Sequence, residues 1–159
     1  MALDTKMKRR GFIGVLASAL ALANIRKAAA QNFLPPQDLR PLIEKLTGGV
    51  PVKTGRVAME MPAIAENGNS IPFTLRVASP MTSADHVLSV HLFAPRNPRP
   101  LVAAFHFGPS AAKAEISTRL RLAGTQKVVA LARMSDGSFW SGETPIVVTA
   151  AACLDEALG

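Results

Sequence analysis

The sequence is poor in cysteine and in large aromatic residues. Its 159 residues include one cysteine, Cys153, one tryptophan and no tyrosine. A single cysteine excludes an internal disulfide framework and a zinc site built from cysteine pairs. The shortage of aromatic residues argues against a stacking surface for single-stranded nucleic acid.

Several motifs of catalysis and cofactor binding are also absent. The sequence has no glycine-rich phosphate loop, no HExxH zinc motif and no GxSxG nucleophile elbow. Its acidic residues are scattered, and no spacing suggests a pair of catalytic carboxylates. We therefore predict no catalytic residues, no metal and no bound cofactor.

The first thirty residues have the organisation of an export signal. Four basic residues lie at positions 6–10, an apolar stretch covers 12–23, and three alanines at 28–30 offer a cleavage site. The pair Arg9-Arg10 is typical of twin-arginine signals. The apolar stretch is shorter than the ~20 residues that span a bilayer, which argues against the alternative of a membrane anchor. We predict a twin-arginine signal peptide over residues 1–30, a mature chain from Gln31, a periplasmic location and no membrane attachment after cleavage.

Most of the excess basic charge belongs to this leader. The whole chain has 18 Lys or Arg and 11 Asp or Glu, whereas residues 31–159 have 12 and 10, which leaves a net charge of +2. The basic balance is therefore no evidence for nucleic acid binding. In an oxidising periplasm an unpaired Cys153 needs a reason: an intermolecular disulfide, including one between two copies of the chain, a reactive thiol, or accident.

Residues 35–49 predict one short helix. Asp38 can cap it and Gly48-Gly49 can end it. Its apolar residues fall on one stripe, which we expect to cover an end or edge of a sheet domain. The stripe consists of Leu39, Leu42, Ile43 and Leu46.

From Gly55 onward, apolar residues alternate with polar or small ones, most clearly over residues 71–77. Pro72 in that segment predicts an edge strand. Turn clusters separate the segments, including ENGNS at 66–70, and no helical segment intervenes. About seven short strands at even spacing favour an antiparallel β-sandwich. The predicted strands cover residues 57–61, 71–77, 88–92, 101–107, 115–122, 127–134 and 145–149.

Three histidines are candidates for a site. His91 and His106 are equidistant from the turn near Pro98, so a simple hairpin places them side by side. Two imidazoles can begin a metal site, but no third ligand follows from the sequence, and we predict structural roles. His86 is predicted at the surface of a strand edge.

Other polar and aromatic residues have a structural and a functional interpretation. We predict that Arg119 and Arg121 lie on a solvated strand face; an anion-steering patch or an interface is the alternative. We predict that Phe139 and Trp140 pack in the core or at a sheet edge; a partner interface is the alternative.

Three segments carry a resemblance to a known family. They are ENGNSIPFTLRVASPMTSADHVLSVHLFAPRNPRP, FHFGP and EISTRLRLAGTQKVVALARMSDGSFW. They resemble SoxY, the sulfur-carrier subunit of the bacterial periplasmic thiosulfate-oxidising (Sox) system, from the helix near Asp38 to about Thr149. The resemblance implies an all-β, immunoglobulin-like antiparallel β-sandwich with a short N-terminal helix over residues 31–149. It also implies a heterodimer with a second β-sandwich subunit, SoxZ.

The resemblance further implies a covalent carrier rather than an enzyme. In that family a thiol on a Gly-Gly-Cys-Gly-Gly arm receives thiosulfate from a c-type cytochrome, and a hydrolase then releases sulfate. Cys153, in the predicted tail over residues 150–159, is the position that matches this thiol. This tail departs from the family pattern, because alanines precede Cys153 and Leu154, Asp155 and Glu156 follow it. Leu154 adds bulk beside the cysteine. The negative charge of Asp155 and Glu156 raises the pKa of the Cys153 thiol and so lowers its thiolate fraction.

Two hypotheses of different classes follow. The first is a sulfur carrier that holds intermediates on Cys153. The second is a non-carrier SoxY-like paralogue that acts as a β-sandwich partner or scaffold with an incidental cysteine. A thiol-nucleophile enzyme is a weaker third, because it needs a base beside Cys153 and the histidines are expected within the sandwich.

Overall fold

The computed structural model describes residues 34–108 and 110–150, which form two packed β-sheets and one helix. The predicted signal peptide over residues 1–30 and Cys153 lie outside the described residues. Within the described part, no helix has the length and hydrophobicity needed to cross a membrane. The elements are α2 (Arg40–Thr47), β1 (Val52–Thr54), β2 (Val57–Glu60), β3 (Ile64–Asn67), β4 (Ile71–Val77), β5 (Val87–Phe93), β6 (Leu101–His106), β7 (Glu115–Leu120), β8 (Gln126–Met134) and β9 (Phe139–Ala150).

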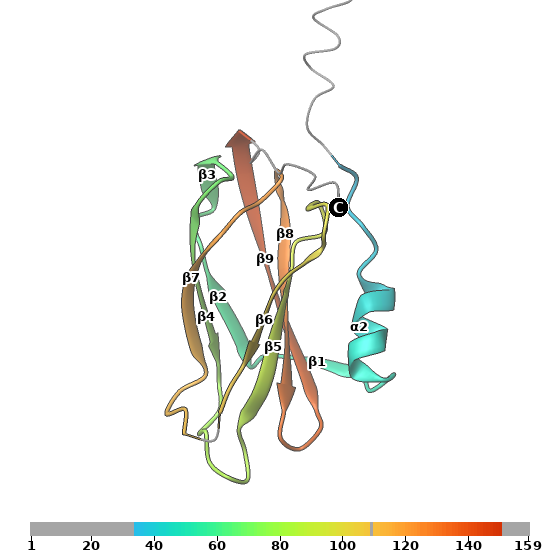
Figure 1. The fold of residues 1–159 in the computed structure, drawn as a ribbon, viewed down its shortest axis with the longest axis vertical. Coiled ribbons are helices and arrows are strands. Elements are labelled where there is room, and N and C mark those ends of the chain that lie inside the picture. The colour runs from blue at the N-terminus through green and yellow to red at the C-terminus, as the bar shows by residue number, and fades with distance from the viewer. Residues whose placement is uncertain (1–33, 109, 151–159) are drawn as a thin grey trace, which may run out of the picture. The chain divides into compact units, whose positions relative to one another are not determined.

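The larger sheet has the strand order β1-β9-β8-β5-β6, and β3 also pairs with β9. The smaller sheet has the order β2-β4-β7. The two sheets face each other as layers of a sandwich, and α2 lies on the far side of the larger sheet (Figure 1). This arrangement confirms the predicted all-β sandwich with a short N-terminal helix.

The core between the sheets follows from the alternation in the sequence. In β4 the residues at 71, 73, 75 and 77 are buried, and those at 72 and 76 are exposed. Facing them from β8 are Val128, Ala130, Ala132 and Met134. Burial of a large apolar side chain contributes about 1.5–3 kcal/mol, so the large residues of this layer stabilise the fold substantially. Every buried side-chain polar atom in the described residues has a hydrogen-bond partner.

The helix covers a face of the larger sheet, not an end or an edge as predicted. The four residues of its apolar stripe pack against Phe93, Leu131 and Phe139. These side chains project from the outer face of the sheet, because residues alternate between the two faces of a strand. The helix ends as predicted at Gly48, which has a left-handed φ of 62°.

The N-cap of the helix lies one residue after the predicted cap, Asp38. Leu39 occupies the N-cap position and makes no side-chain cap bond. The Asp38 carboxylate still accepts a hydrogen bond from the Arg40 backbone N–H at 3.0 Å. The Arg40 guanidinium also contacts this carboxylate and lowers its pKa.

The prediction that Pro72 marks an edge strand is wrong, because β4 is the central strand of the smaller sheet. The pairing explains how the proline is accommodated. The neighbouring strand β2 pairs with β4 only over residues 74–77, so one side of β4 at Pro72 has no partner strand. Pro72 is therefore in an edge environment at the end of a central strand.

Two short strands and part of a long one were not predicted. Both β1 and β3 pair with β9 in parallel, whereas the remaining pairs are antiparallel. The start of the expected ENGNS turn, Glu66-Asn67, is the end of β3. The last strand, β9, begins at Phe139 instead of 145.

Candidate functional site

The end of β9 is the part of the described structure that leads to the predicted thiol. Its last residues are held on one side by β3, where Ala150 pairs with Asn67. The Gly68 N–H donates to the Ala150 carbonyl oxygen at 2.8 Å, and the Val147 N–H donates to the Ala63 carbonyl oxygen at 2.9 Å. The strand end is therefore fixed by backbone bonds up to its final residue.

Two threonine hydroxyls add further bonds to the same strand end. Thr149 Oγ1 donates to the Glu66 carbonyl oxygen at 2.7 Å. On the opposite side, the Val148 N–H donates to Thr125 Oγ1 at 3.0 Å. Since Thr125 lies just before β8 and Glu66 lies in β3, three segments distant in sequence meet at the strand end.

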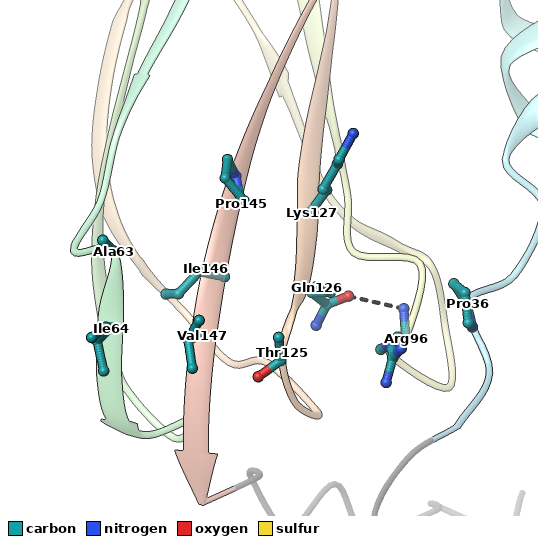
Figure 2. Close-up of a pocket in the computed structure, with 10 residues that line it drawn as sticks. All are labelled: Pro36, Ala63, Ile64, Arg96, Thr125, Gln126, Lys127, Pro145, Ile146 and Val147. Carbon is teal, nitrogen blue, oxygen red and sulfur yellow. Dashed lines mark hydrogen bonds between the residues drawn. The ribbon is translucent and has the colours of Figure 1, made fainter.

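A groove of about 700 Å³ lies beside this strand end. Figure 2 shows Ile64 and Val147 next to each other on β3 and β9, and Arg96 and Pro36 at the other end of the groove. Ile64 is 65% exposed and Val147 47% exposed, which are high values for large apolar side chains. The groove is therefore an open and mainly apolar surface.

Positive charge lies at the same groove. Lys127 and Arg96 belong to its lining. Lys127 forms an ion pair of 2.8 Å with Glu143, and both side chains are 60% exposed. Exposed pairs of this kind contribute little net stability, about 0–1 kcal/mol, so Lys127 can change partners at low cost.

A buried polar cluster fixes the turn that carries Arg96. Asn97 is 5% exposed and Gln126 is 7% exposed. Asn97 Nδ2 donates to the Arg121 carbonyl oxygen at 2.9 Å, and Asn97 Oδ1 accepts the Ala123 N–H at 2.9 Å. Gln126 Oε1 accepts the Arg96 N–H at 2.9 Å. These bonds join the turn between β5 and β6 to the loop before β8.

The two histidines lie near each other, but not directly opposite as predicted. His91 pairs with Ala104 and His106 with Ser89, so the imidazoles are diagonal neighbours. Their ring centroids are 6.3 Å apart, and the ring planes are nearly perpendicular at 84°. Burial lowers the pKa of His91, and the neighbouring His106 lowers it further. Within residues 34–108 and 110–150, no three His, Cys, Asp or Glu side chains are grouped to hold a metal ion.

The remaining candidates have structural contacts. His86 precedes β5, and its Nδ1 is 2.9 Å from the Thr82 carbonyl oxygen. Arg119 hydrogen-bonds Ser70, and Arg121 lies just beyond β7. Phe139 is buried under α2, and Trp140 packs against the central core. Sequence analysis did not identify the groove or the threonine contacts, because both depend on pairings between distant segments.

Comparisons with known proteins identify the family. The profile of the family described as "Sulfur oxidation protein SoxY" matches residues 43–153, which is more than half of the chain. The structure of the sulfur carrier protein SoxY from Chlorobium limicola f thiosulfatophilum is similar at 28% identity, with a TM-score of 0.59. That match covers 70% of this chain and 96% of the Chlorobium chain. A search of curated proteins found no match.

More distant structures share the fold alone. Superoxide reductase (neelaredoxin) from Ignicoccus hospitalis is 15% identical with a TM-score of 0.54, over 61% of this chain and 94% of that one. A putative superoxide reductase from Thermotoga maritima is 14% identical with a TM-score of 0.51, over 73% and 94%. Since a fold does not specify a function, these matches assign no redox chemistry. The chain belongs to the SoxY family, and its role is in sulfur oxidation.

Proposed function

We propose that this chain is a periplasmic sulfur carrier that holds sulfur intermediates covalently on Cys153. Membership of the SoxY family supports a role in the sulfur-oxidising (Sox) system. The fixed end of β9 supports a position of the Cys153 thiol close to this end of the sandwich. An extended chain advances at most about 3.3–3.6 Å per residue, so the Cα of Cys153 lies within about 11 Å of the Cα of Ala150. Because the cysteine follows the strand end so closely, a partner enzyme has to approach this end of the sandwich to reach it.

The proposed chemistry balances without a catalytic group from this chain. In the loading step the Cys153 thiolate and thiosulfate form an S–S bond and give up two electrons to a c-type cytochrome, which leaves Cys–S–S–SO3⁻. In the release step a hydrolase adds water to the terminal sulfone, which leaves sulfate, two protons and the Cys153 persulfide. The chain is therefore the substrate of its partner enzymes rather than an enzyme itself, and it needs no cofactor.

The proposed partners and location follow from the same family. A SoxZ-like β-sandwich subunit forms the heterodimer, and the c-type cytochrome and the sulfate-releasing hydrolase act on it in turn. The twin-arginine leader over residues 1–30 exports the chain to the periplasm. The domain over 31–149 then supports the tail over 150–159.

One observation favours a second candidate function. The tail has Leu154 and Asp155 where the family has two glycines, and Glu156 follows them; these residues reduce backbone freedom and repel an anionic substrate. A non-carrier scaffold, in which the sandwich binds a partner and Cys153 has no role, is consistent with this tail.

Growth of the host on thiosulfate distinguishes the sulfur carrier from the non-carrier scaffold. Sulfate production is compared in cells with the wild-type chain, with Cys153→Ser and with the gene deleted. A carrier predicts that Cys153→Ser is as defective as the deletion. Sulfate production close to wild type with Cys153→Ser contradicts the carrier and supports the scaffold.

A further inference from the structure

The outer face of the larger sheet is only partly covered. Near the middle of β8, Val129 and Leu131 pack against the cluster under α2. Two residues earlier, Lys127 lies on the same face because side chains alternate along a strand. Lys127 pairs with Pro145 of β9, which places Pro145 and then Val147 on this face beyond the helix. The apolar groove is thus one part of this face that α2 leaves open.

The residues that follow β9 complement this groove in polarity. The segment 151–159 reads AACLDEALG and combines two leucines, Leu154 and Leu158, with two acids, Asp155 and Glu156. The groove offers Ile64, Pro145 and Val147 for apolar contact, and Lys127 and Arg96 for the acids.

The segment is also long enough to reach the groove. Leu154 follows Ala150 by four residues and reaches up to about 14 Å from it. Val147 lies three residues before Ala150, which is about 10 Å back along the strand. Lys127 is farther back than Val147, because it pairs with Pro145, five residues before Ala150. Asp155 and Glu156 follow Ala150 by five and six residues, so they can reach this greater distance. The reach of the segment therefore allows each group to contact its complement, provided that the chain reverses direction after Ala150.

The size of the groove favours a peptide over a folded partner. Stable protein interfaces use about 20–30 residues on each side, whereas the exposed apolar surface here comes from a few side chains. A nine-residue segment matches that extent.

We propose that the groove is the resting site of residues 151–159, with Leu154 against Ile64 and Val147 and the acids beside Lys127 and Arg96. The inference rests on the proposed carrier function, since its effect is to regulate access to Cys153. Docking holds the thiol against the domain between reactions, and an enzyme that processes Cys153 has to compete with the groove for the tail. Leu154 and Asp155, which replace glycines of the family arm, and the following Glu156 are then docking residues.

The test uses the ¹⁵N-labelled exported chain and two variants that leave its length unchanged. Leu154→Ser weakens the tail side, and Val147→Ser weakens the groove side. Both variants are expected to shift the amide resonances of Ile64 and Lys127, and to raise the rate of Cys153 alkylation by N-ethylmaleimide severalfold. The control Val52→Ser changes an exposed valine on β1, which pairs with the opposite end of β9, and is expected to change neither readout.

Charge and concentration provide two more comparisons. Lys127→Glu is expected to raise the alkylation rate, with Lys45→Glu on the exposed side of α2 as control, and added salt is expected to reduce the difference. The amide shifts are expected to be independent of protein concentration. Shifts that grow with concentration assign the groove to a second copy of the chain and overturn the proposal, as do alkylation rates that Leu154→Ser and Val147→Ser leave unchanged.

Failure of docking is distinguishable from failure of the carrier function. Sulfur adducts on Cys153, detected by mass, report the carrier function whatever the tail contacts. Adducts together with an unchanged alkylation rate overturn the docking alone.

Discussion

Thr149 Oγ1 donates a hydrogen bond of 2.7 Å to the backbone carbonyl oxygen of Glu66. This bond joins the penultimate residue of β9 to β3, a strand that lies more than eighty residues earlier in the chain. Together with the Gly68–Ala150 backbone bond, it fixes the point from which the chain continues toward Cys153. The sandwich thus holds the end of β9 in a fixed position, as the proposed presentation of Cys153 to partner enzymes requires.

Replacing Thr149 by valine is expected to loosen this base. The substitution keeps the shape of the side chain but removes the hydroxyl, and a hydrogen bond of this kind contributes about 0.5–1.5 kcal/mol. Hydrogen exchange of the Gly68 amide should accelerate, because its acceptor on Ala150 is no longer held in place. Thr149→Ser retains the hydroxyl and serves as control, and equal exchange rates in the two variants contradict the role given to this bond.

Gly142 marks a close approach between the two sheets. A Cβ atom at this position would lie 2.7 Å from the backbone carbonyl oxygen of Val57 on β2. Backbone cannot move aside as a flexible side chain can, so Gly142→Ala is expected to destabilise the fold by about 1–3 kcal/mol. Urea denaturation measures this loss. Gly108→Ala is the matched control, since a Cβ there meets nothing within 4 Å, and an equal stability of both variants argues against the close approach.

Asn97 is expected to be the most sensitive polar residue of the domain. Asn97→Ala removes a buried side chain and leaves the Arg121 carbonyl and the Ala123 N–H, both in partly buried surroundings, without this partner. Each lost hydrogen bond contributes about 0.5–1.5 kcal/mol, so the urea midpoint should fall. The exposed Asn69→Ala should have little effect. A midpoint for Asn97→Ala that equals the control shows that the cluster does not hold the turn that carries Arg96.

The histidine pair predicts a dependence of stability on pH. Because burial and His106 lower the pKa of His91, the unfolded chain takes up a proton more readily than the folded one. The contribution of His91 is therefore complete above the pKa of an unperturbed histidine, about 6.5, and is lost as the pH falls through and below it. The fall in Tm between about pH 7.5 and pH 5.5 should be smaller in His91→Gln than in the wild type. His106→Gln removes only the smaller cause and should have a smaller effect, and an unchanged pH dependence in His91→Gln contradicts this explanation.

The strands with strict alternation were predictable from sequence, and the shorter ones were not. Residues 71–77 alternate because one face of β4 meets the core, and their pattern alone predicts the strand. By contrast, β1 and β3 have three and four residues, too few for a pattern, and they exist because β9 offers an unpaired edge. The start of β9 contains Gly142 and polar residues and lacks an alternating apolar pattern, so its pairing with β8 could not be predicted from the sequence.

The candidate site was predictable only in part. Cys153 stands out because it is the one thiol of the chain. The groove depends on the register that brings Ile64 beside Val147, and no local pattern encodes a contact between such distant residues. The position of α2 on a sheet face, which leaves the groove open, depends in the same way on Phe93 and Leu131 pointing outward.

Intact-protein mass spectrometry of the chain, purified without reductant from its own periplasm during thiosulfate oxidation, tests the central claim most directly. A carrier is expected to show adducts with the masses of a thiosulfonate or of added sulfane sulfur, and a Cys153→Ser chain from the same cells is expected to show none. A bare or merely dimerised Cys153, in cells that are actively oxidising thiosulfate, contradicts the carrier function and leaves the sandwich as a binding module.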